Sequence, residues 1–271
     1  MGGIIVRQRL GIVFVMAAIS SFAWSTVTAQ TQSTVAPSPI LPSDSELDAL
    51  LSARNWDRLG AILSPQAGPT SEFARKLNWL QTRIDNGGGF FLALLYARNF
   101  WVVGNSWVVG NNVKIDDPAN DPRLTAGLFS LYAFELIVID GARCEDRSAP
   151  DNRTSQLLAA QAATLEFLKQ QRPDLRLKIV DNAIAMERKT APLRKDDDLV
   201  CRGGIEEMKI SVPLATQPDA SRPPGYHGRR VAVAPPPGWS PTLVSPEVYR
   251  SMQDKARASM REDLLRLVGL S

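Results

Sequence analysis

The residue best suited to acid–base chemistry is Glu135, the only charged side chain in the apolar segment 124–139. A carboxyl group among apolar side chains keeps its proton to higher pH, because burial disfavours the charged form. A raised pKa is what a general acid in glycan cleavage requires. The same burial is also explained by an ion pair, for which Arg98 in the other apolar segment, 90–103, is the candidate. We expect the structural role, since no second carboxylate has a defined place beside Glu135.

The histidine and cysteine content limits other kinds of chemistry. With one histidine, His227, and two cysteines, Cys144 and Cys201, the chain cannot form a His/Cys zinc site or a His-rich metal cluster. His227 lies in a stretch rich in proline and glycine, which makes it a poor general base for a nucleophile. An even pair of cysteines in an oxidising compartment is most simply a disulfide. We predict a Cys144–Cys201 bond that stabilises the fold by about 4 kcal/mol.

Two acidic clusters could supply oxygen ligands to a hard cation. One includes Asp116, Asp117 and Asp121, and the other covers positions 196–198. Neither has the alternating spacing and fixed glycine of an EF-hand loop, and both lie beside proline or lysine, as solvated loops do. We therefore expect no bound metal and no cofactor.

The amino terminus has the pattern of a secretory signal peptide. Arg7 and Arg9 precede an apolar run over 10–18, and small residues follow at 27–29. The run is shorter than the roughly 20 residues of a spanning helix, so a cleavable signal at 1–29, cut near Ala29, is favoured over an uncleaved membrane anchor. This pattern predicts a secreted or periplasmic protein.

The charge is nearly balanced once that signal is set aside. The whole chain has 31 basic and 28 acidic residues, for a net charge of +3. Two of the basic residues belong to the signal, which leaves +1. Residues 30–217 carry −2 and residues 218–271 carry +3, so the positive charge lies in the tail. Such a balance gives little attraction to phosphates, and we expect no nucleic-acid partner.

Helical periodicity and capping signals dominate residues 44–211. The segments 90–103 and 124–139 are apolar nearly all round, which is typical of buried helices. Further helices are expected about them, one of them at about 153–171. Residues 175–190 mix strand-like alternation with helical spacing, and we favour helix. The sequence thus predicts a mainly α protein with a single helical domain of five or six helices at 44–211, after a flexible lead-in at 30–43.

A short repeat separates the two apolar segments. Trp101-Val102-Val103-Gly104-Asn105 is followed by a second Trp-Val-Val-Gly-Asn that begins at Trp107. The six-residue period fits a short β-hairpin, and it fits a helix end followed by a loop equally well. Exposed, Trp101 and Trp107 would form an aromatic patch for a partner, whereas packed they would close over the core.

The carboxyl-terminal quarter changes character. Nine prolines lie between positions 213 and 246, which predicts a Pro-rich linker at 212–245. An amphipathic helix is predicted at 246–271, because Pro246 and Glu247 suit its first turn and apolar residues recur along one side. Contact of this helix with an anionic membrane surface is a weak alternative to docking on the body or on another protein. The candidate partner-binding residues of this region are Tyr226, Trp239, Arg257 and Arg261.

From these patterns we expect an exported, non-catalytic helical protein that binds another cell-envelope or secreted component through the tail or through the Trp-Val-Val-Gly region. The alternative is a glycan hydrolase, acting on the cell wall, with Glu135 as general acid. A third possibility, a small-ligand binder, requires a sizeable and partly polar cavity in the helical core.

Overall fold

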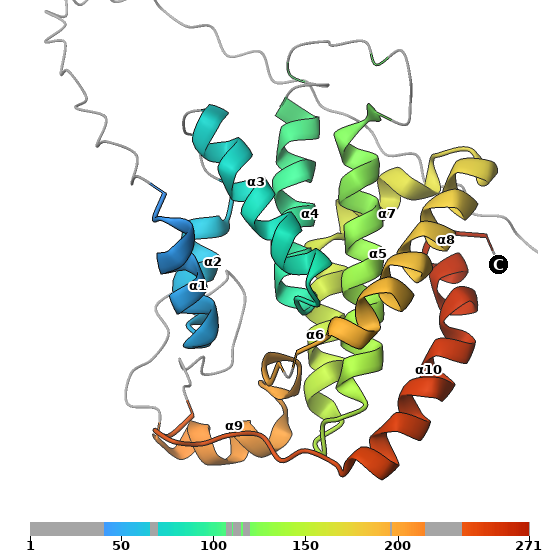
Figure 1. Cartoon of the computed structure of the whole chain (residues 1–271). Coiled ribbons are helices and arrows are strands. Elements are labelled where there is room, and N and C mark those ends of the chain that lie inside the picture. The colour runs from blue at the N-terminus through green and yellow to red at the C-terminus, as the bar shows by residue number, and fades with distance from the viewer. Residues whose placement is uncertain are drawn as a thin grey trace, which may run out of the picture. The chain divides into compact units, whose positions relative to one another are not determined.

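The computed structural model describes residues 41–65, 70–106, 110, 115, 120–195, 197–214 and 235–270 (Figure 1). These residues form ten α-helices and no strand, which confirms a mainly α protein. The helices are α1 (Asp44–Ser52), α2 (Trp56–Leu63), α3 (Thr70–Asp85), α4 (Phe90–Gly104), α5 (Pro122–Gly141), α6 (Ser148–Ala160), α7 (Ala162–Lys169), α8 (Pro173–Thr190), α9 (Ile205–Ser211) and α10 (Pro246–Leu267). The predicted signal peptide, most of the predicted linker, Trp107, Tyr226 and His227 lie outside the described residues.

The expected number of five or six helices is too low. Arg54 takes a left-handed backbone conformation, with φ of 54°, and separates α1 from α2. The helix expected over 153–171 is divided at Gln161, whose buried Oε1 accepts hydrogen bonds from Ser130 and Thr164. A further short helix, α9, precedes the predicted linker. The division at Arg54 follows from its backbone conformation, and the division at Gln161 coincides with a contact to Ser130 of α5, neither of which periodicity reveals.

Helices α4 and α5 lie side by side at the centre of the described fold, as their apolar sequences predict (Figure 1). α5 is long and apolar enough to cross a membrane, yet 83% of its apolar window is buried inside the protein. Asp121 caps α5 by accepting the backbone N–H of Arg123, and Pro122 occupies the first turn. A helix without a polar face is thus buried by its neighbours.

The amino-terminal helices cover one side of α4. Ser43 and Glu46 form a capping box at the start of α1. The buried Trp79 ring of α3 donates its indole N–H to Asp48 of α1 at 3.2 Å, and Arg83 of α3 pairs with the same carboxylate. Apolar burial and these interactions of Asp48 together hold α1 against α3.

On the other side, α5 contacts α6, α7, α8 and α10. Residues 173–190 are one continuous helix, so the helical reading of this ambiguous stretch is confirmed. α10 lies along α5 and α8 (Figure 1). Its Met260 and Leu264, with Val268 just beyond, are buried in a core cluster shared with α5 and α8. The tail helix is therefore part of the core rather than a free appendage.

The Trp-Val-Val-Gly repeat does not begin as a strand. Trp101 belongs to the last turns of α4, so the helix-end alternative holds for the first copy and the hairpin is wrong there. The half-buried Trp101 ring packs edge-on against Phe167 of α7, with ring centroids 6.0 Å apart. The residue closes over the core instead of forming an open patch. The second Trp-Val-Val lies outside the described residues.

Candidate functional site

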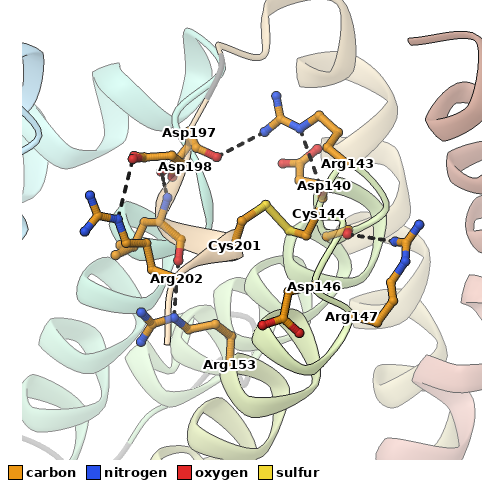
Figure 2. The surroundings of a disulfide bond; sticks show 12 residues. Asp140, Arg143, Cys144, Asp146, Arg147, Arg153, Asp197, Asp198, Cys201 and Arg202 are labelled. Carbon is orange, nitrogen blue, oxygen red and sulfur yellow. Dashed lines mark hydrogen bonds and ion pairs between the residues drawn. A yellow bond between two sulfur atoms is a disulfide. The ribbon is translucent and has the colours of Figure 1, made fainter. Parts of the chain in front are cut away.

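A disulfide joins the loop after α5 to the short 3-10 turn η4 (Leu199–Cys201) (Figure 2). Cys144 and Cys201 are bonded as predicted, with 5.2 Å between their Cα atoms and a separation of 57 positions in sequence. Both cysteines are buried. The bond fixes two loops beside each other, and the charged side chains labelled in Figure 2 surround it.

The segment before α10 is held to the same loop by its backbone. Glu145 donates its N–H to the carbonyl of Thr242 at 3.1 Å, and Val244 donates to the carbonyl of Arg143 at 2.8 Å. These two bonds lie on either side of an isolated bridge between Cys144 and Leu243. The extended pairing brings Trp239, a predicted partner-binding residue, close to the disulfide region.

Helix α9 is positioned by capping groups from a distant part of the chain. Asp146 accepts the N–H of Glu206 at 2.9 Å, and the Ser148 hydroxyl accepts the N–H of Ile205 at 2.7 Å. Burial opposes the charge of Asp146, but hydrogen bonds from Ser148 and from backbone N–H groups hold its pKa below the ordinary value. These bonds satisfy the first N–H groups of α9, which has no cap from its own sequence.

Two cavities meet at Trp239. The larger, of about 690 Å³, lies between the α1–α2 turn and α9 and includes Trp56, Arg202 and Met208 in its wall. The smaller, of about 650 Å³, includes Ile210 and the loop after Cys144. Both are within the range of small-molecule sites. The Arg202 guanidinium lies 5.2 Å from the centre of the Trp239 ring, a cation–π contact that fixes the ring.

The α9 segment exposes apolar side chains beside Trp239. Met208 is 48% exposed and Ile210 is 43% exposed, although both are large and apolar. Each shares a cavity wall with Trp239. We call the three residues together the Trp239 surface. Such a patch, which costs solubility when left open, is typical of a binding region.

Glu135 is enclosed by the core and has no partner. Its side chain is 0% exposed, and neither carboxyl oxygen makes a hydrogen bond with any described residue. Arg98, the expected partner, is exposed, so the predicted pair is wrong: Arg98 lies on the solvent side of α4. Burial, reinforced by the nearby Glu187 carboxylate, raises the pKa of Glu135 to about 8. A third cavity, of about 440 Å³, has Asp48 and Arg83 in its wall. Glu135 lines neither this cavity nor the two at Trp239.

The pairs that were expected for Glu135 are formed by its neighbours. Arg194 donates to both oxygens of Asp140 at 3.1 Å and to Glu187 at 2.6 Å. Arg257 of α10 also binds Glu187, at 3.1 Å. With Glu135, these four residues form what we call the buried charge cluster. It joins α5, α8, α10 and the loop after α8.

The two candidate arginines of the tail are engaged within the chain. Arg257 belongs to the buried charge cluster, and Arg261 pairs with Asp181 of α8 at 3.1 Å. Their partners within the chain compete with any external partner. Of the six candidate partner-binding residues, Trp239 alone is both described and placed beside cavities.

The acidic cluster at 196–198 was expected to be a solvated loop, but the described members, Asp197 and Asp198, bind other groups of the protein. Asp198 pairs with Arg54 at 3.3 Å. It also pairs with Arg202 at 3.6 Å (Figure 2). Burial raises the pKa of Asp197 to about 6, although the N–H of Leu199 donates to it. No group of three possible metal ligands gathers among the residues that the structure describes.

Sequence reasoning missed Arg202 and Ser211, which line the larger cavity, and it gave Trp56 a helical role only. They lie far apart in sequence, so no motif or spacing signals the site. No protein-family model, curated protein or solved structure matches the chain.

Proposed function

We propose that this is an exported, non-catalytic protein that binds another cell-envelope or secreted component through the Trp239 surface. The observation that supports this most directly is the position of Trp239 between two cavities, beside the exposed Met208 and Ile210. Tryptophan and arginine are the residues most often responsible for binding energy at interfaces. Here an arginine, Arg202, holds the tryptophan in place.

The enclosure of Glu135 favours binding over glycan hydrolysis. A general acid must come within hydrogen-bond distance of the atom that it protonates. Glu135 is fully buried and lines none of the three described cavities. Its raised pKa has a packing explanation that needs no substrate, because burial and a neighbouring carboxylate cause it.

Export is supported by two independent features. The Cys144–Cys201 disulfide suits an oxidising compartment. The residues at 1–29 have the signal pattern described above. Mass spectrometry of the chain purified from its native compartment should give a terminus near Gln30 and no free thiol. An intact amino terminus or two free thiols would contradict export by a cleaved signal.

Photo-crosslinking tests the binding surface. A photoreactive side chain replaces Met208 in the full chain, expressed in the source organism, and the matched control carries it at Leu177, which is 37% exposed on α8. We expect a mass-shifted adduct from position 208 and little from position 177, and Trp239→Ala should reduce the adduct. Equal adducts from both positions, or none from position 208, would overturn the proposal.

A further inference from the structure

The segment between Trp239 and α10 has an edge that is free of hydrogen bonds. Residues 242–244 run antiparallel to the loop at 143–145, and Cys144 and Leu243 lie opposite each other in an isolated bridge. The two hydrogen bonds of this bridge belong to the flanking residues, so the N–H and C=O of Leu243 itself point away from the loop. Neither group bonds to any residue that the structure describes. An extended chain can therefore add to this free edge.

The free edge lies beside the most apolar part of the described surface. Nine large apolar side chains of the described residues are exposed, and five of them lie at 205–212 or at Leu243. Figure 1 shows the segment running beside α9 to the start of α10, and Ile210 of α9 shares a cavity wall with Pro241 and Thr242. A strand added at the free edge would remove apolar side chains of this surface from water.

The smaller cavity, beside the free edge, favours a basic side chain. Its wall includes three acidic residues and one basic residue, namely Glu145, Asp146, Glu206 and Arg147. Arg147 donates to the last carbonyl of α5 at 3.0 Å, Glu206 pairs with Lys209 at 2.7 Å, and Asp146 caps α9. Glu145 is exposed and forms no ion pair with any described residue. Its carboxylate is therefore available to a cation of a partner.

Trp239 and Ile210 supply the apolar part of the same wall. Lysine and arginine combine an apolar stem with a charged head, and both parts interact favourably with an aromatic ring. A basic side chain in this cavity can place its stem against Trp239 and its head near Glu145. We infer that the Trp239 surface binds an extended segment of another protein, in which a basic residue lies between apolar ones and the backbone pairs with Leu243. The inference rests on the proposed binding function and names the chemistry of the partner.

Fluorescence anisotropy with labelled pentapeptides tests the inference on the full, disulfide-bonded chain. The probes have the sequence Thr-Val-Xaa-Val-Thr, with lysine, serine or glutamate at the centre, a neutral fluorophore at the amino terminus and an amidated carboxyl terminus. We expect the lysine peptide to bind with a dissociation constant below about 1 mM. The glutamate peptide should bind about ten-fold more weakly or less, because it brings a second carboxylate to the acidic wall.

Backbone N-methylation distinguishes strand pairing from a general attraction between charges. Successive N–H groups of a strand point to opposite edges, so methylation at alternate positions removes either the N–H groups that face Leu243 or none of them. One lysine peptide is methylated at both valines, and the other at the lysine and the last threonine. We expect one of the two to lose about ten-fold in affinity and the other to bind as the unmethylated peptide does.

Glu145→Gln tests the charge on the protein. It should weaken binding of the lysine peptide about two- to five-fold, the effect of an exposed ion pair, and leave the serine peptide unchanged. The matched control is Glu262→Gln on α10, where the side chain is 73% exposed, and it should change neither affinity. Because both positions are exposed, both variants should unfold at the midpoint of the parent.

Four outcomes would overturn the inference. They are no binding of the lysine peptide, equal affinities of the lysine and glutamate peptides, equal affinities of the two methylated peptides, and a lysine-peptide affinity that Glu145→Gln leaves intact. Adduct formation at Met208 without binding of the lysine peptide would refute the basic segment and leave the proposed function standing. Peptide binding without an adduct at Met208 would refute that surface as the place where a larger component docks.

Discussion

The buried charge cluster and the cavity at Trp239 are built from similar residues and differ in what encloses them. Both combine arginines with carboxylates in ion pairs. In the cluster, the side chains of Arg194, Asp140 and Glu187 are between 4% and 9% exposed, and helices close around them. In the wall of the cavity of about 690 Å³, Arg54 is 50% exposed.

The difference shows why a perturbed carboxyl group is a poor guide to function by itself. The pKa of Glu135 is raised more than that of Asp197, yet no described cavity reaches Glu135. Trp239 does not titrate, yet it lines two cavities. Access to a ligand, more than the size of a pKa shift, distinguishes the candidate site from the structural one.

Removing α10 should unfold the core that closes around the buried charge cluster. A chain that ends at position 245 exposes the core around Met260, Leu264 and Val268, whose burial is worth about 2–5 kcal/mol each. That sum rivals the whole stability of a domain, about 5–15 kcal/mol, so we expect no cooperative unfolding by circular dichroism. Val248→Ala, at an exposed position of the same helix, is the control and should unfold as the parent does. A stable truncated chain would show that the tail is separable after all.

Arg194→Ala should destabilise the protein by about 3–5 kcal/mol, because Asp140 and Glu187 would each lose a buried partner. Arg261→Ala is the matched control, since Arg261 and Asp181 are both more than half exposed, and its effect should stay below about 1 kcal/mol. Denaturant titration measures both free energies of unfolding. Similar small losses from the two variants would mean that the cluster does not hold the helices together.

The titration of Glu135 should make stability depend on pH. Its folded-state pKa of about 8 lies above the ordinary value of 4.5, so the folded chain keeps a proton that the unfolded chain releases. The free energy of unfolding should therefore fall as pH rises from about 4.5 to about 8. Glu135→Gln should remove this fall and stabilise the protein at pH 8 by up to about 4 kcal/mol. Identical pH profiles for the variant and the parent, from denaturant titration, would contradict this origin.

The smallest expected effect on stability comes from a methionine substitution on the Trp239 surface, compared with one in the core. Met208→Ala on the Trp239 surface should change the free energy of unfolding by less than about 0.5 kcal/mol, because the side chain is 48% exposed. Met260→Ala on α10, where the side chain is 2% exposed, should cost about 2–5 kcal/mol. Denaturant titration compares the two. A large loss from Met208→Ala would mark α9 as structural rather than as a binding element.

The elements of this fold were predictable where their signals are local. Ser43 and Glu46 cap α1, and Pro122 begins α5, as the sequence indicates. The two apolar segments form the central pair of helices, α4 and α5. These features depend on residues within one or two turns of each other. Capping and apolar periodicity are physical properties of such short stretches.

The features that required the structure depend on contacts distant in sequence. The apolar side of an amphipathic helix does not reveal which surface covers it. The sequence therefore could not decide whether α10 docks on α5 and α8. Arg194, in a stretch with the composition of a solvated loop, is buried because Asp140 and Glu187 bind it. The cavity joins Trp56, Ser211 and Trp239, which only folding and the disulfide bring together.

Carbene footprinting of the full chain in its native envelope, against the purified chain, tests the central claim most directly. Met208 on α9 and Val248 at the start of α10 are 48% and 51% exposed, so bare protein should label at both. We expect the native envelope to protect Met208 and to leave Val248 labelled as in the purified chain. Protection of Val248 with full labelling of Met208 would place the binding region on the tail helix and contradict binding through the Trp239 surface.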